Sequence, residues 1–248
     1  MTIGPGLRTL LALSVAVGFA QMPIAQTPNT LTSAERSAGW RVLFDGRTTK
    51  GWHAFGTGKT ADESGWTVTD GTLVALGQPA NAANDIVTDD EFENFDLVVD
   101  WKLSPQANSG IFFNVVEQGY KEIYATGPEY QLIDEDGWPG KLEDWQKAGA
   151  NYAMQPPLAK AIKLVGEWNH TRIFVDRGHV TGWMNDIKTA EYQMWTPEWN
   201  ASRLAGKWKD YPGYGQAHTG KLGLQNHGNK IWFRNIKVRV RSPSGTGA

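Results

Sequence analysis

The sequence has no cysteine among its 248 residues, so disulfides, thiolate metal sites and a cysteine nucleophile are excluded. It also lacks an excess of charge of either sign, because 24 Lys and Arg stand against 26 Asp and Glu. The formal net charge of −2 therefore favours no nucleic acid and no anionic membrane as partner. P-loop, dinucleotide-binding, zinc-protease and serine-hydrolase motifs are missing, so no motif indicates those enzyme classes.

An apolar run at residues 10–20 follows Arg8 and is too short to span a membrane. Gly18 and Ala20 stand at positions −3 and −1 of a cleavage site, which predicts a secretory signal peptide. The protein is then secreted or periplasmic, with no transmembrane segment after signal cleavage. The expected organisation is a signal peptide at 1–20, a flexible lead-in at 21–38, one domain at 39–241 and a disordered tail at 242–248.

Short runs that alternate apolar and polar side chains recur along the chain, separated by Gly-, Asn- or Asp-containing breaks. The pairs Asp70-Gly71 and Arg177-Gly178 lie between such runs and predict hairpin turns. No segment has a clear amphipathic helical period over more than two turns. The sequence therefore predicts an all-β fold, a two-layer antiparallel β-sandwich of jelly-roll type.

The alternation also predicts a polar face. If the strands share a sheet, one surface holds Asp100, Asn114, Glu129, Gln131, His170, Arg172, Gln225 and His227. Twelve residues are tryptophan, and polar groups beside aromatic rings suit a carbohydrate. The segments 135–165 and 195–219 do not have a strand pattern. We expect them to form walls around this face, with at least one of Trp138, Trp145, Trp199 and Trp208 lining the cleft.

Several blocks between Trp40 and Val240, including GWRVLFDGRTTKGW, SGIFFN, GPEYQLID, GEWNHTRI, GWMND, LGLQNHG and WFRNIKV, resemble the 3-keto-disaccharide hydrolase family. The resemblance implies a sandwich of the concanavalin-A-like lectin/glucanase type and an exported enzyme that acts on glycosides oxidised at C3. Three positions depart from the family pattern: Asn114 replaces a common Arg, Gly182 a common His, and Asn226 the Asp of LQDHG.

A ketone at C3 acidifies the proton on C2, so a base can start elimination of the C1 substituent, and water can then add back. We expect Glu129 or His170 as the base, and Arg172, His227 or a possible divalent metal ion at the enolate oxygen. No cofactor is certain. The expected substrate-binding residues are Asn108, Asn114, Gln131, Asn169, Trp183 and Gln225.

Two alternatives stay open. The first is a non-catalytic lectin-like domain, which needs the same polar and aromatic surface but no perturbed acid or base. The second is a conventional glycosidase with two carboxylates about 5 Å apart for retention, or about 6.5–9.5 Å for inversion. Gln131 follows Glu129 at the same-face spacing, so Asp100 on another strand is the remaining partner for such a pair.

Overall fold

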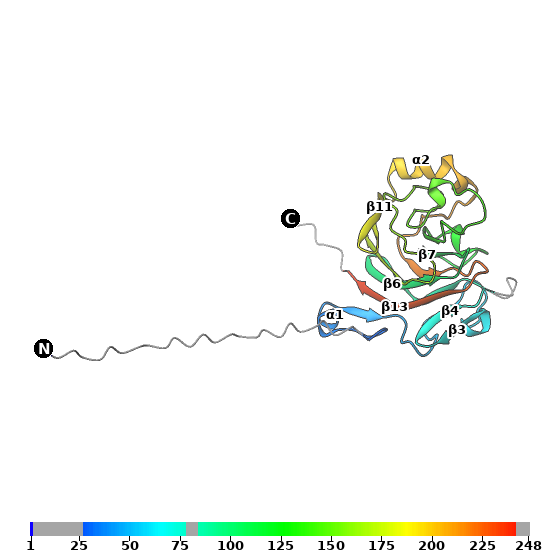
Figure 1. The fold of residues 1–248 in the computed structure, drawn as a ribbon. Helices are drawn as coiled ribbons and strands as arrows, with labels where there is room; N and C mark the ends of the chain where they lie inside the picture. The colour runs from blue at the N-terminus through cyan, green and yellow to red at the C-terminus, as the bar shows by residue number, and fades with distance from the viewer. Residues whose placement is uncertain (2–26, 78–83, 242–248) are drawn as a thin grey trace, which may run out of the picture.

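The protein is described by a computed structural model that covers residues 1, 27–77 and 84–241. Two antiparallel β-sheets pack face to face (Figure 1), which confirms the predicted two-layer β-sandwich. The predicted signal peptide and C-terminal tail lie outside the described residues, apart from residue 1.

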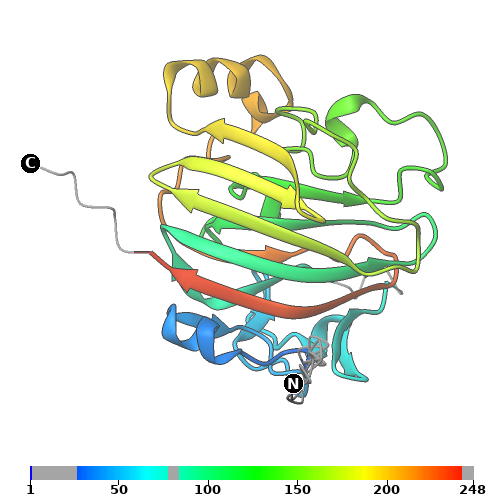
Figure 2. The ribbon, with the colours of Figure 1, turned by 60° about the vertical axis from the view of Figure 1, so that its left-hand side comes forward.

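The larger sheet, sheet A, has eight strands. Figure 2 shows β11, β10, β9, β6 and β13 side by side across its face. The remaining strands β4, β3 and β1 join through β13. The strands are β1 (Trp40–Val42), β3 (Trp66–Thr69), β4 (Thr72–Ala75), β6 (Phe95–Leu103), β9 (Asn169–Asp176), β10 (His179–Met184), β11 (Ile187–Gln193) and β13 (Ile231–Val240).

The smaller sheet, sheet B, has five strands in the order β2-β5-β12-β7-β8. They are β2 (Trp52–Ala54), β5 (Ile86–Phe92), β7 (Asn108–Val115), β8 (Glu129–Ile133) and β12 (Gly220–Leu224). We did not predict β2 and β5. In β5 the acidic half of IVTDDEF interrupts the apolar alternation, although its Asp89 and Glu91 simply face solvent.

The predicted hairpins are confirmed, since β3 joins β4 and β9 joins β10 through tight turns. Both central residues have positive φ in each, at 49° and 72° for Asp70-Gly71 and 50° and 77° for Arg177-Gly178. This conformation matches the twist of the flanking strands. The core lies between the sheets and buries alternate side chains of both, such as Val99 from β6 and Phe113 from β7.

The segments outside the strands contain two α-helices and four short 3₁₀ helices within the described residues. Their bounds are α1 (Ser33–Ser37), η1 (Asp62–Ser64), η2 (Ile123–Ala125), η3 (Asp144–Gln146), α2 (Pro197–Ala205) and η4 (Lys207–Asp210). None of the helices in this part of the chain is long and apolar enough to cross a membrane.

The segment after β8 closes one side of the sandwich. It bonds to β8 of sheet B, where the Gln131 N–H donates to the Ala150 carbonyl over 3.1 Å. It also bonds to β11 of sheet A, where the Leu158 N–H donates to the Thr189 carbonyl over 2.8 Å. Helix α2 lies over the same end of the molecule (Figures 1 and 2).

The predicted flexible lead-in is partly wrong, because residues 29–38 belong to the fold. Asn29 is buried and donates its side-chain N–H to the Gly71 carbonyl over 2.8 Å. Its backbone N–H donates to Asn235 Oδ1 over 2.6 Å, and its own Oδ1 accepts the Asn235 N–H over 2.8 Å. Glu35 of α1 binds Lys237 at 2.8 Å. These partners lie far away in the sequence, so local composition could not indicate them.

We predict that Asn29→Ala lowers the free energy of unfolding by about 1–3 kcal/mol, because it leaves partly buried backbone groups of Asn235 and Gly71 without partners. Urea denaturation of the full chain measures this change. Ser33→Ala, at an exposed position of α1, is the control and should change little. Equal stability of both variants would mean that residues 29–38 are not anchored to the sheet.

Candidate active site

A row of residues crosses the outer face of sheet B at one end. The backbone N–H of Gln225 donates to the Gly110 carbonyl over 3.0 Å, and Gly110 pairs with Gln131. On the other side, the Asn226 N–H donates to Asp85 Oδ1 over 2.9 Å. Since directly opposite residues of antiparallel strands share a face, Asp85, Gln225 and Gln131 are brought together from three strand ends.

Glu129 of β8 shares this face and is only 5% exposed. Its carboxylate occupies the space left by the missing side chain of Gly110, where an added Cβ would overlap Glu129 Oε1. Among the described residues no donor forms a hydrogen bond to it. Burial raises the pKa of Glu129 to about 8; the positive charge of Lys207 opposes this shift and the negative charge of Asp85 adds to it.

Asp85, immediately before β5, is a second acid of this kind. Burial raises its pKa to about 7, although the hydrogen bond from the Asn226 N–H opposes the rise. Asp85 and Glu129 therefore interact and titrate near neutral pH, where one can hold a proton while the other is ionised. Two acids with such pKa values on one sheet face are typical of a catalytic site.

Lys207, the first residue of η4, brings a positive charge to the carboxylates. Its Nζ lies 4.9 Å from the ring centroid of Tyr124, 4.8 Å from that of Tyr152 and 4.6 Å from that of Trp208. Burial lowers the pKa of Lys207, while the charge of Glu129 opposes this change. The rings hold the ammonium by cation–π attraction and leave its N–H groups for a further partner.

Tyr124 is held as a neutral phenol. Burial, followed by the contact with Tyr211, raises its pKa to about 12. Its hydroxyl can therefore donate a hydrogen bond at any pH at which the neighbouring carboxylates titrate.

A cavity of about 260 Å³ opens beside these groups. Its lining includes Asp85, Tyr124, Gln225, Asn226 and His227. Three buried polar atoms around it have no hydrogen-bond partner within the described residues: Gln131 Oε1, Gln225 Oε1 and Asn226 Nδ2. Buried polar atoms normally find partners, so these atoms indicate a site for a polar ligand such as a sugar.

The predicted convergence holds for only part of the residue set. Glu129, Gln131, Gln225 and His227 do lie at this end of sheet B. His227 is exposed at the cavity.

The predicted convergence was wrong for Asp100, His170 and Arg172, which lie on the outer face of sheet A, on the opposite side of the sandwich. Trp183, predicted to bind substrate, lies on that face as well. There His170 Nδ1 contacts Asp100 Oδ1 at 2.7 Å. Arg172 donates to both carboxylate oxygens of Asp96, and its guanidinium lies 4.9 Å from the Trp183 ring centroid. The strand phase gives the face within one sheet but not the sheet to which a strand belongs.

The three predicted asparagines have different positions. Asn169 Oδ1 accepts hydrogen bonds from Lys163 N–H and Asn185 Nδ2, so its side chain is engaged in holding a loop. Asn114 donates to the Ala217 carbonyl over 2.9 Å and thereby anchors segment 195–219. Asn108 begins β7 in phase with Gly110, and its buried Oδ1 has no partner among the described residues.

Gly182, one of the departures from the family pattern, is also explained by packing. An added Cβ there would overlap the ring of Tyr130. Asn226, another departure, lines the cavity and holds Asp85 through its backbone.

Both predicted wall segments reach the site, but two of their five tryptophans, Trp199 and Trp208, are buried in the core. Trp199 stacks with Tyr192 at 5.5 Å, and Trp145 packs on Tyr152 at 5.3 Å. Trp208 is fully buried and meets the site through Lys207 and the ring of Tyr152.

Sequence reasoning missed Asp85, Tyr124, Tyr152 and Lys207. The signal for Asp85 was its place directly before an apolar pair at the start of β5. Lys207 had no comparable signal, because its neighbours at the site come from distant segments.

Within the described ranges no three or more His, Asp and Glu side chains gather in a way that could hold a metal ion.

Comparison with known proteins finds relatives along most of the chain. A 3-keto-disaccharide hydrolase from Bacteroides thetaiotaomicron is 34% identical over 92% of this chain and 88% of its own. A solved structure from Parabacteroides distasonis, named as a glycosyl hydrolase, has 41% identity and a TM-score of 0.81 over 87% of this chain and 100% of its own. A second glycosyl hydrolase structure from that organism has 29% identity and a TM-score of 0.57 over 77% of this chain and 99% of its own.

The fold, the site and these relatives define a carbohydrate-active enzyme of the hydrolase or lyase type, so the lectin alternative is set aside. Residues 39–239 match the 3-keto-alpha-glucoside-1,2-lyase-like domain. The chain belongs to this family, that of the 3-keto-disaccharide hydrolases, which confirms the resemblance.

The raised pKa of Glu129 predicts a pH-dependent cost in stability. The folded protein binds this proton more tightly than the unfolded chain, so the stabilisation is complete below about pH 4.5 and is lost as the pH rises through about 8. Glu129→Gln removes this loss. As the pH rises from about 4.5 to about 8, the free energy of unfolding of Glu129→Gln should increase relative to that of the native protein, by an amount on the order of a few kcal/mol.

Urea denaturation at a series of pH values measures the difference. Glu93→Gln, at an exposed position, is the matched control and should follow the native pH dependence. A constant difference between Glu129→Gln and the native protein would show that Glu129 is not a buried, weakly compensated acid.

Proposed function

We propose that the enzyme cleaves glycosides whose sugar carries a ketone at C3, by base-initiated elimination followed by hydration. The observation that carries this proposal is a pair of acids that titrate near neutral pH beside a lysine ammonium. An elimination needs a base for a carbon acid and a positive group for the enolate oxygen. The family and the named hydrolase relative support the substrate class.

The proposed reaction is an elimination followed by the addition of water. The base takes the proton from C2, and the electron pair of that bond forms the enolate across C2 and C3. The enolate then re-forms the C3 ketone, a C1=C2 double bond forms, and the C1–O bond breaks as the leaving oxygen takes a proton. Water adds to C1 and C2 regains a proton, which completes a net hydrolysis.

The site supplies a group for each step. Asp85 or Glu129 acts as the base in its ionised form, and the other acid, protonated, can donate to the leaving oxygen. The Lys207 ammonium and the Tyr124 hydroxyl stabilise the negative charge on the C3 oxygen. The free amide atoms of Gln131, Gln225 and Asn226 hold sugar hydroxyls.

A conventional two-carboxylate glycosidase is the second candidate, because Asp85 and Glu129 face the same site. Such an enzyme needs one carboxylate ionised as nucleophile or base next to a protonated acid. It would act on the unoxidised sugar as well, since its chemistry does not depend on a C3 ketone.

We predict release of the aglycone from a 3-keto-glucoside and none from its unoxidised parent. In D₂O, early product should carry deuterium at C2, because the enzyme removes and returns that hydrogen. Mass spectrometry and NMR of the product measure both results, and a no-enzyme reaction corrects for exchange beside the ketone. Hydrolysis of both glucosides with C2 hydrogen retained would favour direct displacement at C1.

The pH dependence should identify the base. The rate should fall as the pH drops through about 7 if the base is Asp85, or through about 8 if it is Glu129, since protonation removes the base. Replacing the base by its amide, Asp85→Asn or Glu129→Gln, should lower kcat by about 10²–10⁴-fold. Asp85→Asn should also shift the part of the pH–rate profile that reports Glu129 to lower pH, because the loss of a neighbouring negative charge lowers the pKa of Glu129.

His170→Gln, on the opposite sheet, is the control and should keep close to the native rate. Full activity in both carboxyl variants would place the base elsewhere.

A further inference from the structure

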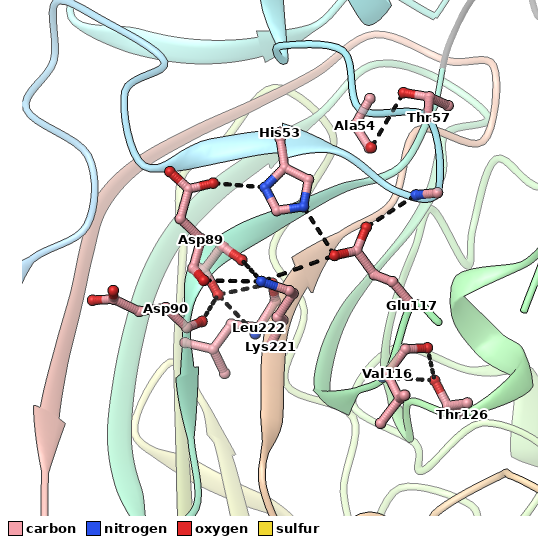
Figure 3. Close-up of polar contacts among 12 residues, drawn as sticks. His53, Ala54, Thr57, Asp89, Asp90, Val116, Glu117, Thr126, Lys221 and Leu222 are labelled. Atoms are coloured by element: carbon pink, nitrogen blue, oxygen red, sulfur yellow. Dashed lines mark hydrogen bonds and ion pairs between the residues drawn. The ribbon is translucent and has the colours of Figure 1, made fainter. Parts of the chain in front are cut away.

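A second polar cluster lies farther along the outer face of sheet B. It joins His53 of β2, Asp89 of β5, Glu117 after β7 and Lys221 of β12 (Figure 3). An apolar cluster of Phe55, Val87, Phe112, Val115 and Ile123 lies beside it on this face, and Phe55 and Ile123 of that cluster also line the cavity. The reaction proposed above uses none of the four charged groups.

The imidazole of His53 lies between two carboxylates (Figure 3). Its Nδ1 is 2.6 Å from Asp89 Oδ1, and its Nε2 is 2.9 Å from Glu117 Oε2. Ionised carboxylates only accept hydrogen bonds, so the ring makes both bonds only when both nitrogens carry a proton. The His53 ring therefore bridges the two carboxylates and links β2 and β5 to Glu117.

The remaining charged neighbour is Lys221. Its Nζ lies 3.8 Å from Glu117 Oε2 and donates to the carbonyls of Thr88 and Asp89 over 3.1 and 2.9 Å. It therefore adds positive charge beside Glu117 while holding β12 against β5.

Glu117 ties down the first part of segment 116–128. Its second oxygen, Oε1, accepts the Gly56 N–H over 3.0 Å, so one carboxylate binds the segment to two points near β2. The ends of the segment are also joined to each other. Thr126 Oγ1 accepts the Val116 N–H over 3.0 Å and donates to the Val116 carbonyl over 3.1 Å.

This segment carries Tyr124 into the active site. Ile123 packs over Gly223, where an added Cβ would overlap its Cδ1, and the next residue, Tyr124, lines the cavity. The segment also holds the wall that contains Lys207, because the Gly215 N–H donates to the Thr126 carbonyl over 2.8 Å. A displacement at Glu117 would therefore move Tyr124 and loosen the segment that carries Lys207.

We propose that His53 is a positioning residue for the reaction, acting through Glu117 to hold segment 116–128 where Tyr124 meets Lys207 and the substrate. The expected effect of His53 on the reaction rate rests on the proposed function, whereas its effect on the position of segment 116–128 is independent of that function.

The test compares His53→Gln, Glu117→Gln, the double variant and His53→Arg. A glutamine at position 53 lacks the two ring nitrogens that reach both carboxylates, so kcat for the 3-keto-glucoside should fall about 10-fold with a smaller change in KM. Glu117→Gln should give a similar loss. The double variant should be no slower than either single one, because both changes break the same contact.

His53→Arg should restore most of kcat, since a guanidinium donates to two carboxylates. His179→Gln, at the start of β10 in sheet A, is the matched control and should keep the native kcat.

Hydrogen exchange gives a readout that needs no substrate. The amides of Gly127 and Gly215, bonded to the Ile123 and Thr126 carbonyls, should exchange faster in His53→Gln than in the native protein and His179→Gln. If the native enzyme fails to cleave the 3-keto-glucoside, the proposed function fails, and exchange alone tests His53. If His53→Gln does not fold, Glu117→Gln and His53→Arg carry both measurements.

The proposal is overturned by losses of kcat that multiply in the double variant. It is equally overturned by native kcat in His53→Gln, or by unchanged exchange at Gly127 and Gly215.

Discussion

The pairing of β12 between β5 and β7 is the constraint on which the active site depends. It sets Gln225 next to Gly110 and brings Asn226 to Asp85, so groups from distant parts of the chain meet at one sheet end. A shift by one residue would turn each of these side chains to the other face. Gly110 is equally necessary, because only a residue without Cβ leaves room for the Glu129 carboxylate.

The environment of the carboxylates differs between the two polar faces of the sandwich. On sheet A, Asp96 accepts from Arg172 and Arg239, and Asp100 accepts from His170 and Asn235, so these carboxylates have their charge compensated within the protein. On sheet B, Glu129 has a raised pKa, and Gln131 and Gln225 keep buried oxygens without partners in the described structure. The face whose acids have raised pKa values and whose amide oxygens lack partners in the described structure is the one able to bind and transform a polar substrate.

The aromatic residues contribute to this site mainly through support. The abundance of tryptophan suggested stacking platforms for a sugar, yet Trp66, Trp101 and Trp208 are fully buried. Trp208 and Tyr214 stack with ring centroids 3.8 Å apart, and this packing supports the short helix that presents Lys207. Rigid support of this kind matters because the rate of an elimination depends on how closely the base and the cation are placed.

The sequence by itself determined the strands with clear alternation, both hairpin turns and the sandwich class, because strand period and turn chemistry are local properties. It also indicated Glu129, Gln131, Gln225 and His227 through their phase. Only the tertiary structure decided that His170 and Arg172 face away from them, since the phase is the same whichever sheet a strand joins. It alone brought Asp85, Tyr124 and Lys207 together, because their meeting depends on long-range pairing and loop packing that no local pattern encodes.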